Sequence, residues 1–447
     1  MGNDFNLNDL LHYNSQIEDL AASMSLSFYP QEFEICSYED MLGYEAYAGI
    51  PVRYPHWSFG KSYERKKTFY RYNLSGLPYE MVINSNPCLA YLMKDNTLLL
   101  QILTMAHVYG HNDFFKNNRL FKLGTKAEYT LEMFRAHARR IREYIKDPSI
   151  GYTGVERIID AAHALRFQIN RIVGEKILTP EEKKEKIIDR YLKSNYSEHP
   201  LLNQENEKQP PNLNHIPLEP EEDLLLFIIR YGSLSEWEKD IVNIVRQESL
   251  YFLPQIETKI MNEGWASYWH YKILNKLGLS QELHLEFLKR HNQVISPFQG
   301  SLNPYHLGFK IFEKLEKQGV DIFSVREQER DFSFIGRYLD EEICREYNLF
   351  SFLKKGRDYY VKEIADEKGW KAVRAVLASN TGMQVVPVIK VVEVGHNNLL
   401  MLEHEWDGRE LNLDYAHHTL KHVSDLWGGK VRLRTMIRTS YQILESN

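Results

Sequence analysis

Two histidines stand four positions apart in the segment AHVYGHNDFFKNN, residues 106–118. His107 and His111 would share one face of a helix, because residues four apart are neighbours on a helical surface. Many zinc peptidases hold their metal with this spacing. Those peptidases keep a water-activating glutamate directly after the first histidine, where this chain has Val108. The segment therefore indicates a metal site without its usual base, a different chemistry, or two structural histidines.

Two other segments also place ionisable residues on one face of an apolar helix. In VERIIDAAHAL, Glu156, Asp160 and His163 are spaced i, i+4 and i+7, and in NEGWASYWH, Glu263 and His270 are seven residues apart. These spacings align the side chains in single stripes. Ionisable groups on buried faces are costly unless they pair with one another or bind a metal. We expect the three stripes to form one polar site.

Two interpretations of the stripes remain open from the residues alone. In the first, each stripe is a hydrogen-bonded network that holds neighbouring helices in register. In the second, His107, His111 and Glu263 are the ligands of a catalytic zinc ion with an open fourth position. Hydrolysis would then need another proton acceptor, and Glu156 is a residue of the right type for that role.

The remaining polar residues of the stripes have other expected roles. A di-iron centre is disfavoured, because only DAAH approximates its Glu-x-x-His pattern and the sequence has no second copy. We instead assign substrate binding to five stripe residues: Asn112, Glu156, Asp160, His163 and His270.

A cysteine near a predicted helix start offers a second chemistry. The segment NPCLAYLM follows a short predicted strand, YEMVIN, and its Asn86 and Pro87 are typical of a helix start. Cys88 would then lie where free N–H groups and the helix dipole stabilise a thiolate. Thiol amidases use such a cysteine together with histidines from elsewhere in the chain. The alternative is that Cys88 is a small apolar core residue, as most lone cysteines are.

Composition limits the classes of partner and the compartment. The 447 residues are 43% hydrophobic and 26% charged, and a net charge of -6 gives no reason to expect nucleic acid or an anionic membrane as a partner. The three cysteines, Cys36, Cys88 and Cys344, are too few and too widely spaced for a disulfide framework or a zinc module. The chain shows no signal-peptide pattern and no window of the ~18 apolar residues that a membrane span needs. We expect a cytoplasmic protein.

Periodicity predicts a mainly α fold, with a large helical domain followed by a small C-terminal α+β domain. Helical patterns dominate residues 1–325, which carry the expected site. The polar, proline-rich residues 194–222 are expected to form a long surface loop within that domain. In residues 330–447 the pattern changes to strand-like segments with one helix that ends at glycine.

Four motifs, in this order along the chain, resemble those of the stage V sporulation protein R (SpoVR) family: INSNPCLAYLM, AHVYGHNDFFKNN, GVERIIDAAHAL and MNEGWASYWHYKIL. The likeness covers nearly the whole chain and is weakest at residues 194–222. It implies a cytoplasmic bacterial protein, which in sporulating species acts in the mother cell and is needed to form the spore cortex, a specialised peptidoglycan. Family members in bacteria that make no spores imply that the underlying biochemistry need not be cortex assembly. The stretch EGWA also resembles the glutamate-bearing helix of some metallopeptidases.

These observations lead to one expected function and one rival. The expected function is cortex assembly through action on amide bonds of a peptidoglycan peptide or precursor. The reaction would be zinc-assisted hydrolysis or thiol-mediated acyl transfer. The rival is a non-enzymatic scaffold that organises cortex-synthesis proteins through its C-terminal domain. An enzyme should expose its polar residues in an open cleft, whereas a scaffold should enclose them and pair them with each other.

Overall fold

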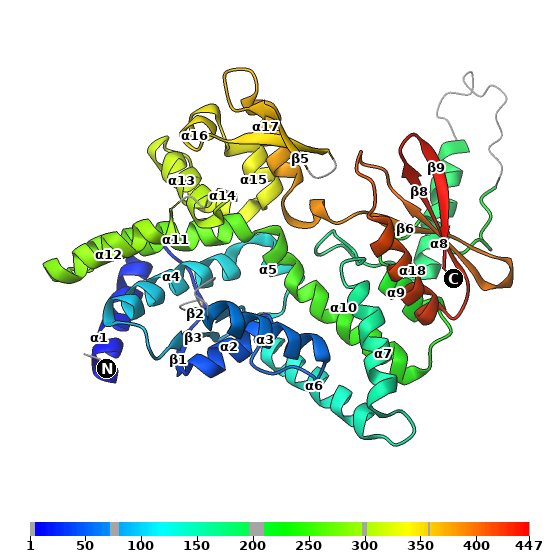
Figure 1. The fold of residues 1–447 in the computed structure, drawn as a ribbon, viewed down its shortest axis with the longest axis horizontal. Helices are drawn as coiled ribbons and strands as arrows, with labels where there is room; N and C mark the ends of the chain where they lie inside the picture. Colours follow the sequence, from blue (N-terminus) through cyan, green and yellow to red (C-terminus); the bar gives the residue numbers. More distant parts are fainter. Residues whose placement is uncertain (1–4, 72–79, 196–209, 297–301, 356–357, 447) are drawn as a thin grey trace. The chain divides into compact units, whose positions relative to one another are not determined.

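The chain folds mainly into α-helices with a small α+β part at its C-terminus, which confirms the predicted fold class (Figure 1). The structure is a computed structural model that describes residues 5–71, 80–195, 210–296, 302–355 and 358–446. Within these ranges, no helix is both long enough and apolar enough to cross a lipid bilayer. The predicted loop at 194–222 lies partly outside them, and its described residues from 210 onward form no helix.

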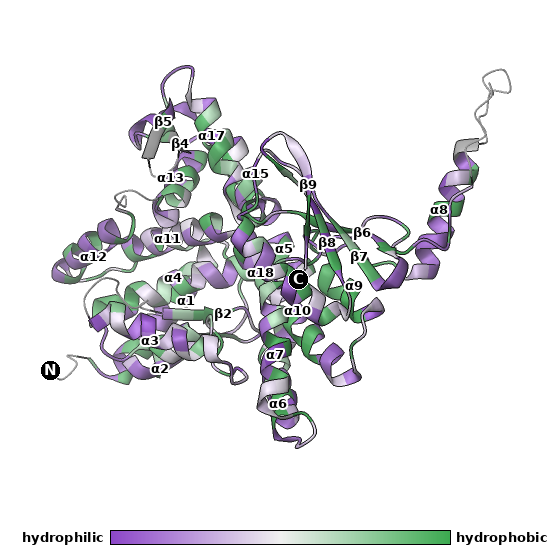
Figure 2. Cartoon of the chain, turned by 45° about the vertical axis from the view of Figure 1, so that its right-hand side comes forward, coloured by the Kyte–Doolittle hydropathy of each residue, from purple (hydrophilic) through white to green (hydrophobic). Residues whose placement is uncertain are grey.

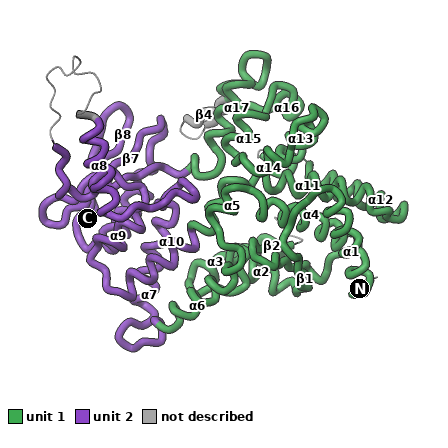
Figure 3. Tube along the Cα trace, turned by 180° about the vertical axis from the view of Figure 1, so that it is seen from behind, with its two compact units in different colours: residues 1–143, 250–385 green, residues 144–249, 386–447 purple. Residues whose placement is uncertain are grey.

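The chain divides into two compact units, and each unit consists of two separate stretches of sequence (Figure 3). Unit 1 consists of residues 1–143 and 250–385, and unit 2 consists of residues 144–249 and 386–447. The predicted helical stripes are therefore distributed over both units. His107, His111 and Glu263 belong to unit 1, whereas the stripe of Glu156 belongs to unit 2.

Unit 1 is built around two buried helices, α4 (Leu98–Asn117) and α11 (Lys259–Lys276), which pack against each other. Every residue of α4 from Leu99 to Phe115 is buried, and hydrophobic residues dominate the first half of the helix (Figure 2). A helix that is buried all round belongs in a core rather than on a surface. The side chain of Trp265 on α11 is fully buried and packs against surrounding aromatic rings.

Helix α10 (Glu236–Glu257) begins in unit 2 and ends in unit 1, and further helices complete unit 1. They are α1 (Leu7–Ser23), α2 (Tyr38–Ala46), α3 (Trp57–Arg71), α5 (Arg119–Gly124), α6 (Thr130–Lys146), α12 (Gln281–Val294), α13 (Pro304–Lys317), α14 (Ile322–Gln328), α15 (Asp331–Tyr338), α16 (Glu341–Glu346) and α17 (Trp370–Ser379). The strands β4 (Phe350–Lys355) and β5 (Asp358–Ile364) form a separate antiparallel pair.

A three-stranded sheet beside α4 corrects one prediction. Its order is β1 (Gln31–Cys36), β3 (Cys88–Met93), β2 (Glu80–Ile83), with β3 parallel to β1 and antiparallel to β2. The helix predicted for residues 86–93 is therefore wrong, because residues 88–93 form the central strand. A short apolar run bonded on both edges is buried as a strand, and periodicity alone cannot distinguish it from a buried helix.

Unit 2 combines several helices with a four-stranded sheet. The sheet order is β6 (Ile389–Gly395), β7 (Leu399–His404), β8 (Val431–Ile437), β9 (Ser440–Glu445). The helices α7 (Gly151–Ala164), α9 (Leu224–Tyr231) and α18 (Leu413–Trp427) pack together, and the ring of Phe227 stacks on that of Trp427. The helix α8 (Pro180–Asn195) also belongs to this unit.

Glycines let the helices of the unit 1 core approach each other closely. A methyl carbon placed on Gly110 of α4 would lie only 2.7 Å from the Cα of Ala266 on α11. A methyl carbon on Gly264 of α11 would overlap the backbone of Gly308 on α13. The absence of side chains at these points sets the separation of the three helices, and with it the positions of the histidines on α4.

Replacing Gly110 with alanine should therefore separate α4 from α11. We expect Gly110→Ala to lower the free energy of unfolding by about 2–3 kcal/mol, the upper part of the usual cost of overpacking a core. Gly336→Ala is the matched control, because nothing lies within 4 Å of a methyl group there, and it should be neutral or stabilising by up to about 1 kcal/mol. Equal chemical denaturation curves for the two variants would contradict this account of the helix crossing.

Candidate metal centre

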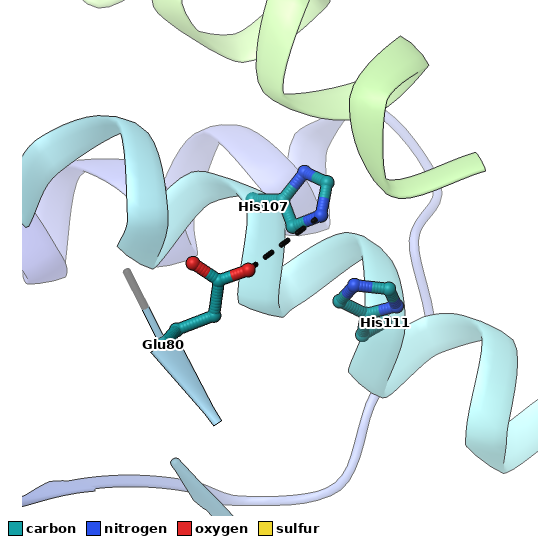
Figure 4. Close-up of side chains that lie close together, drawn as sticks. All are labelled: Glu80, His107 and His111. Atoms are coloured by element: carbon teal, nitrogen blue, oxygen red, sulfur yellow. Dashed lines mark ion pairs between the residues drawn. The ribbon is translucent and has the colours of Figure 1, made fainter. Parts of the chain in front are cut away.

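Four ionisable side chains from three elements converge in unit 1. The Nε2 atom of His111 lies 3.5 Å from Oε2 of Glu263, and the Nε2 atom of His107 lies 3.8 Å from the same oxygen. An oxygen of Glu80 on β2 lies 4.0 Å from Nε2 of His107, and its carboxylate points toward that ring (Figure 4). One ligand atom each from Glu80, His107 and His111 fits within a mutual distance of 4.8 Å.

Two atoms of this cluster are buried and face each other without satisfying their hydrogen-bonding capacity. Among the described residues, neither Nε2 of His107 nor Oε2 of Glu263 has a hydrogen-bond partner, and 3.8 Å is too long for a bond between them. Zinc–ligand bonds of ~2.1 Å in a tetrahedron place the ligand atoms about 3.4 Å apart. The spacing and the donor set of two imidazoles with carboxylates fit zinc or a similar divalent transition metal.

Buried acceptors at the ends of the helices fix the positions of these ligands. The carboxylate of Asp331 accepts hydrogen bonds from the N–H groups of Ile260 and Met261, at the start of α11 and just before Glu263. The carboxylate of Asp113 on α4 accepts a hydrogen bond of 2.8 Å from the indole of Trp265 on α11. Each bond satisfies groups that would otherwise be buried unpaired, and the bond between Trp265 and Asp113 joins α11 to α4 in one relative register.

The electrostatics of the cluster favour an ionised Glu263 and a neutral His111. Burial alone would raise the pKa of Glu263, but the two histidines beside it make the net shift a lowering. Burial, followed by the neighbouring ring of His107, lowers the pKa of His111 to about 4. Burial and the charge of Glu263 raise the pKa of Glu80, against the opposing effect of His107. An ionised carboxylate and imidazoles with free lone pairs are the forms that bind a metal.

Two further residues border the cluster. The ring of Tyr305, at the start of α13, stacks on that of His107 with centroids 6.1 Å apart. The charge of Glu263, followed by burial, raises the pKa of Tyr305 well above its usual value, so the phenol remains a proton donor. His270 lies on the other side of His107, with the two Nδ1 atoms 2.9 Å apart.

The residues assigned to substrate binding do not all lie here. Asn112 is fully buried, and its amide bonds to the backbone of Tyr29 and to the side chain of Gln31. Those bonds hold α4 to the segment leading into β1. On α7 in unit 2, Glu156 accepts a hydrogen bond of 2.8 Å from Tyr152. Asp160 and His163 are on the same helix, so this stripe is in a different unit from the histidines of α4.

Cys88 is not at a helix start, contrary to the sequence interpretation. It is the first residue of the central strand β3, is fully buried, and its thiol donates to the carbonyl of Ile83. Burial raises the pKa of Cys88 well above its usual value, whereas a helix N-terminus would have lowered it. The physical features that were expected to make this thiol nucleophilic are therefore missing from its surroundings.

The sequence did not indicate Glu80, Tyr305 or His291 as site residues. The Nδ1 atom of His291 lies 2.8 Å from Nε2 of His270. Glu80 stands in the predicted strand YEMVIN, where it alternates with the buried Met81 and Ile83. A lone acid on the opposite face of a short apolar strand is the available signal. Only the pairing of β2 with β3 brings that face toward α4, and the sequence does not specify the pairing.

The fold and the cluster define a mainly helical protein with a histidine–carboxylate site suited to a divalent metal. Residues 4–386 match the family described as SpoVR like protein, and residues 387–438 match the SpoVR-like C-terminal domain. The uncharacterized protein YcgB from Escherichia coli (strain K12) is 35% identical over 484 residues, covering 97% of this chain and 92% of the relative. No solved structure matches the chain significantly. The chain belongs to the SpoVR family.

The cluster predicts a zinc-binding protein whose affinity depends on both helices. Protein purified without chelators should carry about one zinc ion per chain, as measured by elemental analysis. We expect His111→Ala and Glu263→Gln to weaken zinc binding by at least about 100-fold while far-UV circular dichroism stays unchanged, because each variant removes a direct ligand. His306→Ala, a half-buried histidine outside the cluster, is the control. Equal zinc content in all variants would place the metal elsewhere.

The environment of Cys88 predicts a thiol that does not react in the folded protein. Alkylation at neutral pH should be slow for Cys88, because the thiolate is disfavoured and the sulfur is buried. Burial also raises the pKa of Cys36 and of Cys344 to about 11, so no selective labelling is expected. After unfolding, all three should react at similar rates, as mass spectrometry can follow. Rapid, selective alkylation of Cys88 in the native protein would restore the thiol chemistry.

Proposed function

We propose that this chain is a metal-dependent amide hydrolase that acts on a peptidoglycan peptide or precursor. The single observation that carries the proposal is the facing pair, Nε2 of His107 and Oε2 of Glu263, with Nε2 of His111 close by. Two buried polar atoms that face each other without a hydrogen bond are costly, and a cation between them would relieve that cost. We take His107, His111 and Glu263 as the ligands and zinc as the metal.

Glu80 is the proposed general base. Val108 stands where zinc peptidases have their basic glutamate. Glu80, on β2 rather than on the helix of the two histidines, would take over that role. Its raised pKa moves it toward the range in which a carboxylate accepts a proton efficiently at neutral pH. Glu80 would take a proton from the attacking water and pass it to the leaving amine as the C–N bond breaks. The products are a carboxylate and an amine.

The remaining chemistry is divided between the metal and Tyr305. When bound, zinc would polarise the amide carbonyl and lower the pKa of a bound water molecule. The phenol of Tyr305 lies beside the carboxylates and stays protonated, so it would donate a hydrogen bond to the negative charge that develops on the carbonyl oxygen. His107 and His111 would hold the metal through their Nε2 atoms.

Hydrolysis is favoured over thiol-mediated acyl transfer by the contrast between the two sites. The thiol of Cys88 is fully buried, whereas the side chains of Glu80 and Glu263 are 18% and 20% exposed. A substrate or water molecule can therefore reach the carboxylates more readily than the sulfur. The exposure of the two carboxylates favours an enzyme over the scaffold alternative, although His107, His270 and His291 are enclosed and bonded to each other as a scaffold would have them.

The biological setting follows from the family. In a sporulating species we propose that the activity serves cortex assembly from the cytoplasm of the mother cell, on a peptidoglycan precursor. Cortex-synthesis proteins would be its partners in this process. The family also has members in bacteria that make no spores. We therefore propose that the reaction acts on cell-wall peptides in general and that cortex assembly is one use of it.

A conservative change at Glu80 tests the assigned roles. Glu80→Gln keeps the size of the side chain and removes its basicity. We expect this variant to retain zinc and to lose at least about 100-fold in the rate of amine release from peptidoglycan stem peptides, the usual contribution of a general base.

Glu156→Gln is the matched control for Glu80→Gln, since Glu156 was the base suggested by residue type and lies on α7 in unit 2. It should hydrolyse the same peptides at the wild-type rate. Full activity in Glu80→Gln, with loss of activity in Glu156→Gln, would reverse the assignment of the base.

A further inference from the structure

A row of three buried histidines extends from the candidate metal centre into the protein core. His107 on α4 has its Nδ1 atom 2.9 Å from Nδ1 of His270 on α11. The Nε2 atom of His270 lies 2.8 Å from Nδ1 of His291 on α12. The three side chains belong to residues that are 3%, 0% and 3% exposed. Both contacts have hydrogen-bond length, so each must join one N–H group to one nitrogen lone pair.

The two hydrogen bonds of the row have only two arrangements when the rings are neutral, because a neutral imidazole has one N–H group and one lone pair. In the outward arrangement, His107 donates to His270 and His270 donates to His291. The Nε2 atom of His107 then keeps its lone pair toward Glu263. In the inward arrangement, His291 donates to His270 and His270 donates to His107. The Nε2 atom of His107 then carries the proton.

The surroundings of the two inner histidines support the neutral form. Burial, followed by the neighbouring imidazoles, lowers the pKa of His270 well below its usual value. Burial, followed by His107 and the ammonium group of Lys310, lowers the pKa of His291 to about 4. The aromatic rings of Tyr271 and Phe309 pack against His291 on two sides. Among the described residues, the groups that shift the pKa values of these two histidines all lower them.

We propose that His270 and His291 are positioning residues that couple metal binding at Nε2 of His107 to the direction of hydrogen bonding along the whole row. This inference rests on the proposed metal centre. A metal bound at Nε2 needs the outward arrangement, whereas the nearby carboxylates of Glu80 and Glu263 favour the inward one by attracting an N–H group. Metal binding would thus move the proton to the other ring nitrogen in all three histidines. His291 would change its tautomer although His107 and His270 lie between it and the metal.

Nuclear magnetic resonance on wild-type protein with isotope-labelled histidine tests this coupling directly. Ring nitrogen shifts distinguish a nitrogen that carries a proton from one that does not. Without zinc, the proton of His291 should be on Nδ1, and with one equivalent of zinc it should be on Nε2. His270 should change in the same direction, from Nδ1 to Nε2. A His291 tautomer that is identical with and without bound zinc would overturn the proposal.

Variants of His291 give a second readout that does not depend on turnover. His291→Phe keeps the ring and removes the acceptor, and we expect it to weaken zinc binding by about 10- to 100-fold, the usual effect of losing an outer partner of a ligand. His291→Asn offers its side-chain oxygen as an acceptor and should recover most of the affinity. His284→Phe, on the same helix but outside the row, is the matched control and should bind zinc as the wild type does.

The outcomes separate this inference from the proposed function. Wild-type protein that binds no added zinc would end both. Wild-type protein that binds zinc, together with equal affinity in His291→Phe and His291→Asn, would end only the coupling and leave the metal centre standing. Should His291→Phe fail to fold, the tautomer measurement on the wild type decides the question by itself.

Discussion

The close crossing of α4 and α11 is the contact on which the candidate metal centre depends. His107 and His111 are on one helix and Glu263 is on the other, so the distance between the helices sets the distance between nitrogen and carboxylate. Gly110 brings the two backbones together, and the buried bond from Trp265 to Asp113 fixes their register. Both helices are buried along most of their length, which supports the fixed spacing that a ligand set requires.

The cluster also explains why unit 1 keeps so many ionisable groups beside an apolar core. Two carboxylates and four imidazoles converge there, although each is expensive to bury. The histidine–histidine bonds satisfy the inner part of the group. At its outer part, Nε2 of His107 and Oε2 of Glu263 face each other without a hydrogen bond, and a divalent cation between them would offset the cost of their burial. A bound cation would therefore give the lowest free-energy cost of burying these ionisable residues.

Local patterns predicted the helices of the site, and tertiary pairing decided the rest. The spacing of His107 and His111 indicates a helix face, and the same reasoning applies to Glu263 and His270. The stripe of Glu156 has an equally regular spacing but is in unit 2, because spacing says nothing about which helices pack together. The segment around Cys88 is short and apolar throughout, so its hydrophobic periodicity does not distinguish a strand from a helix. Pairing between β2 and β3 makes it a strand and places Glu80 near the histidines.

The central claim is that two imidazoles and a carboxylate hold a metal between α4 and α11. X-ray absorption spectroscopy at the zinc edge of the zinc-loaded protein tests it most directly, because it identifies the atoms bound to the metal. The account predicts a first shell of nitrogen and oxygen at ~2.0–2.1 Å with the outer-ring scattering of two imidazoles. A sulfur neighbour at ~2.3 Å, or a shell without imidazole, would contradict it and assign the metal to other residues.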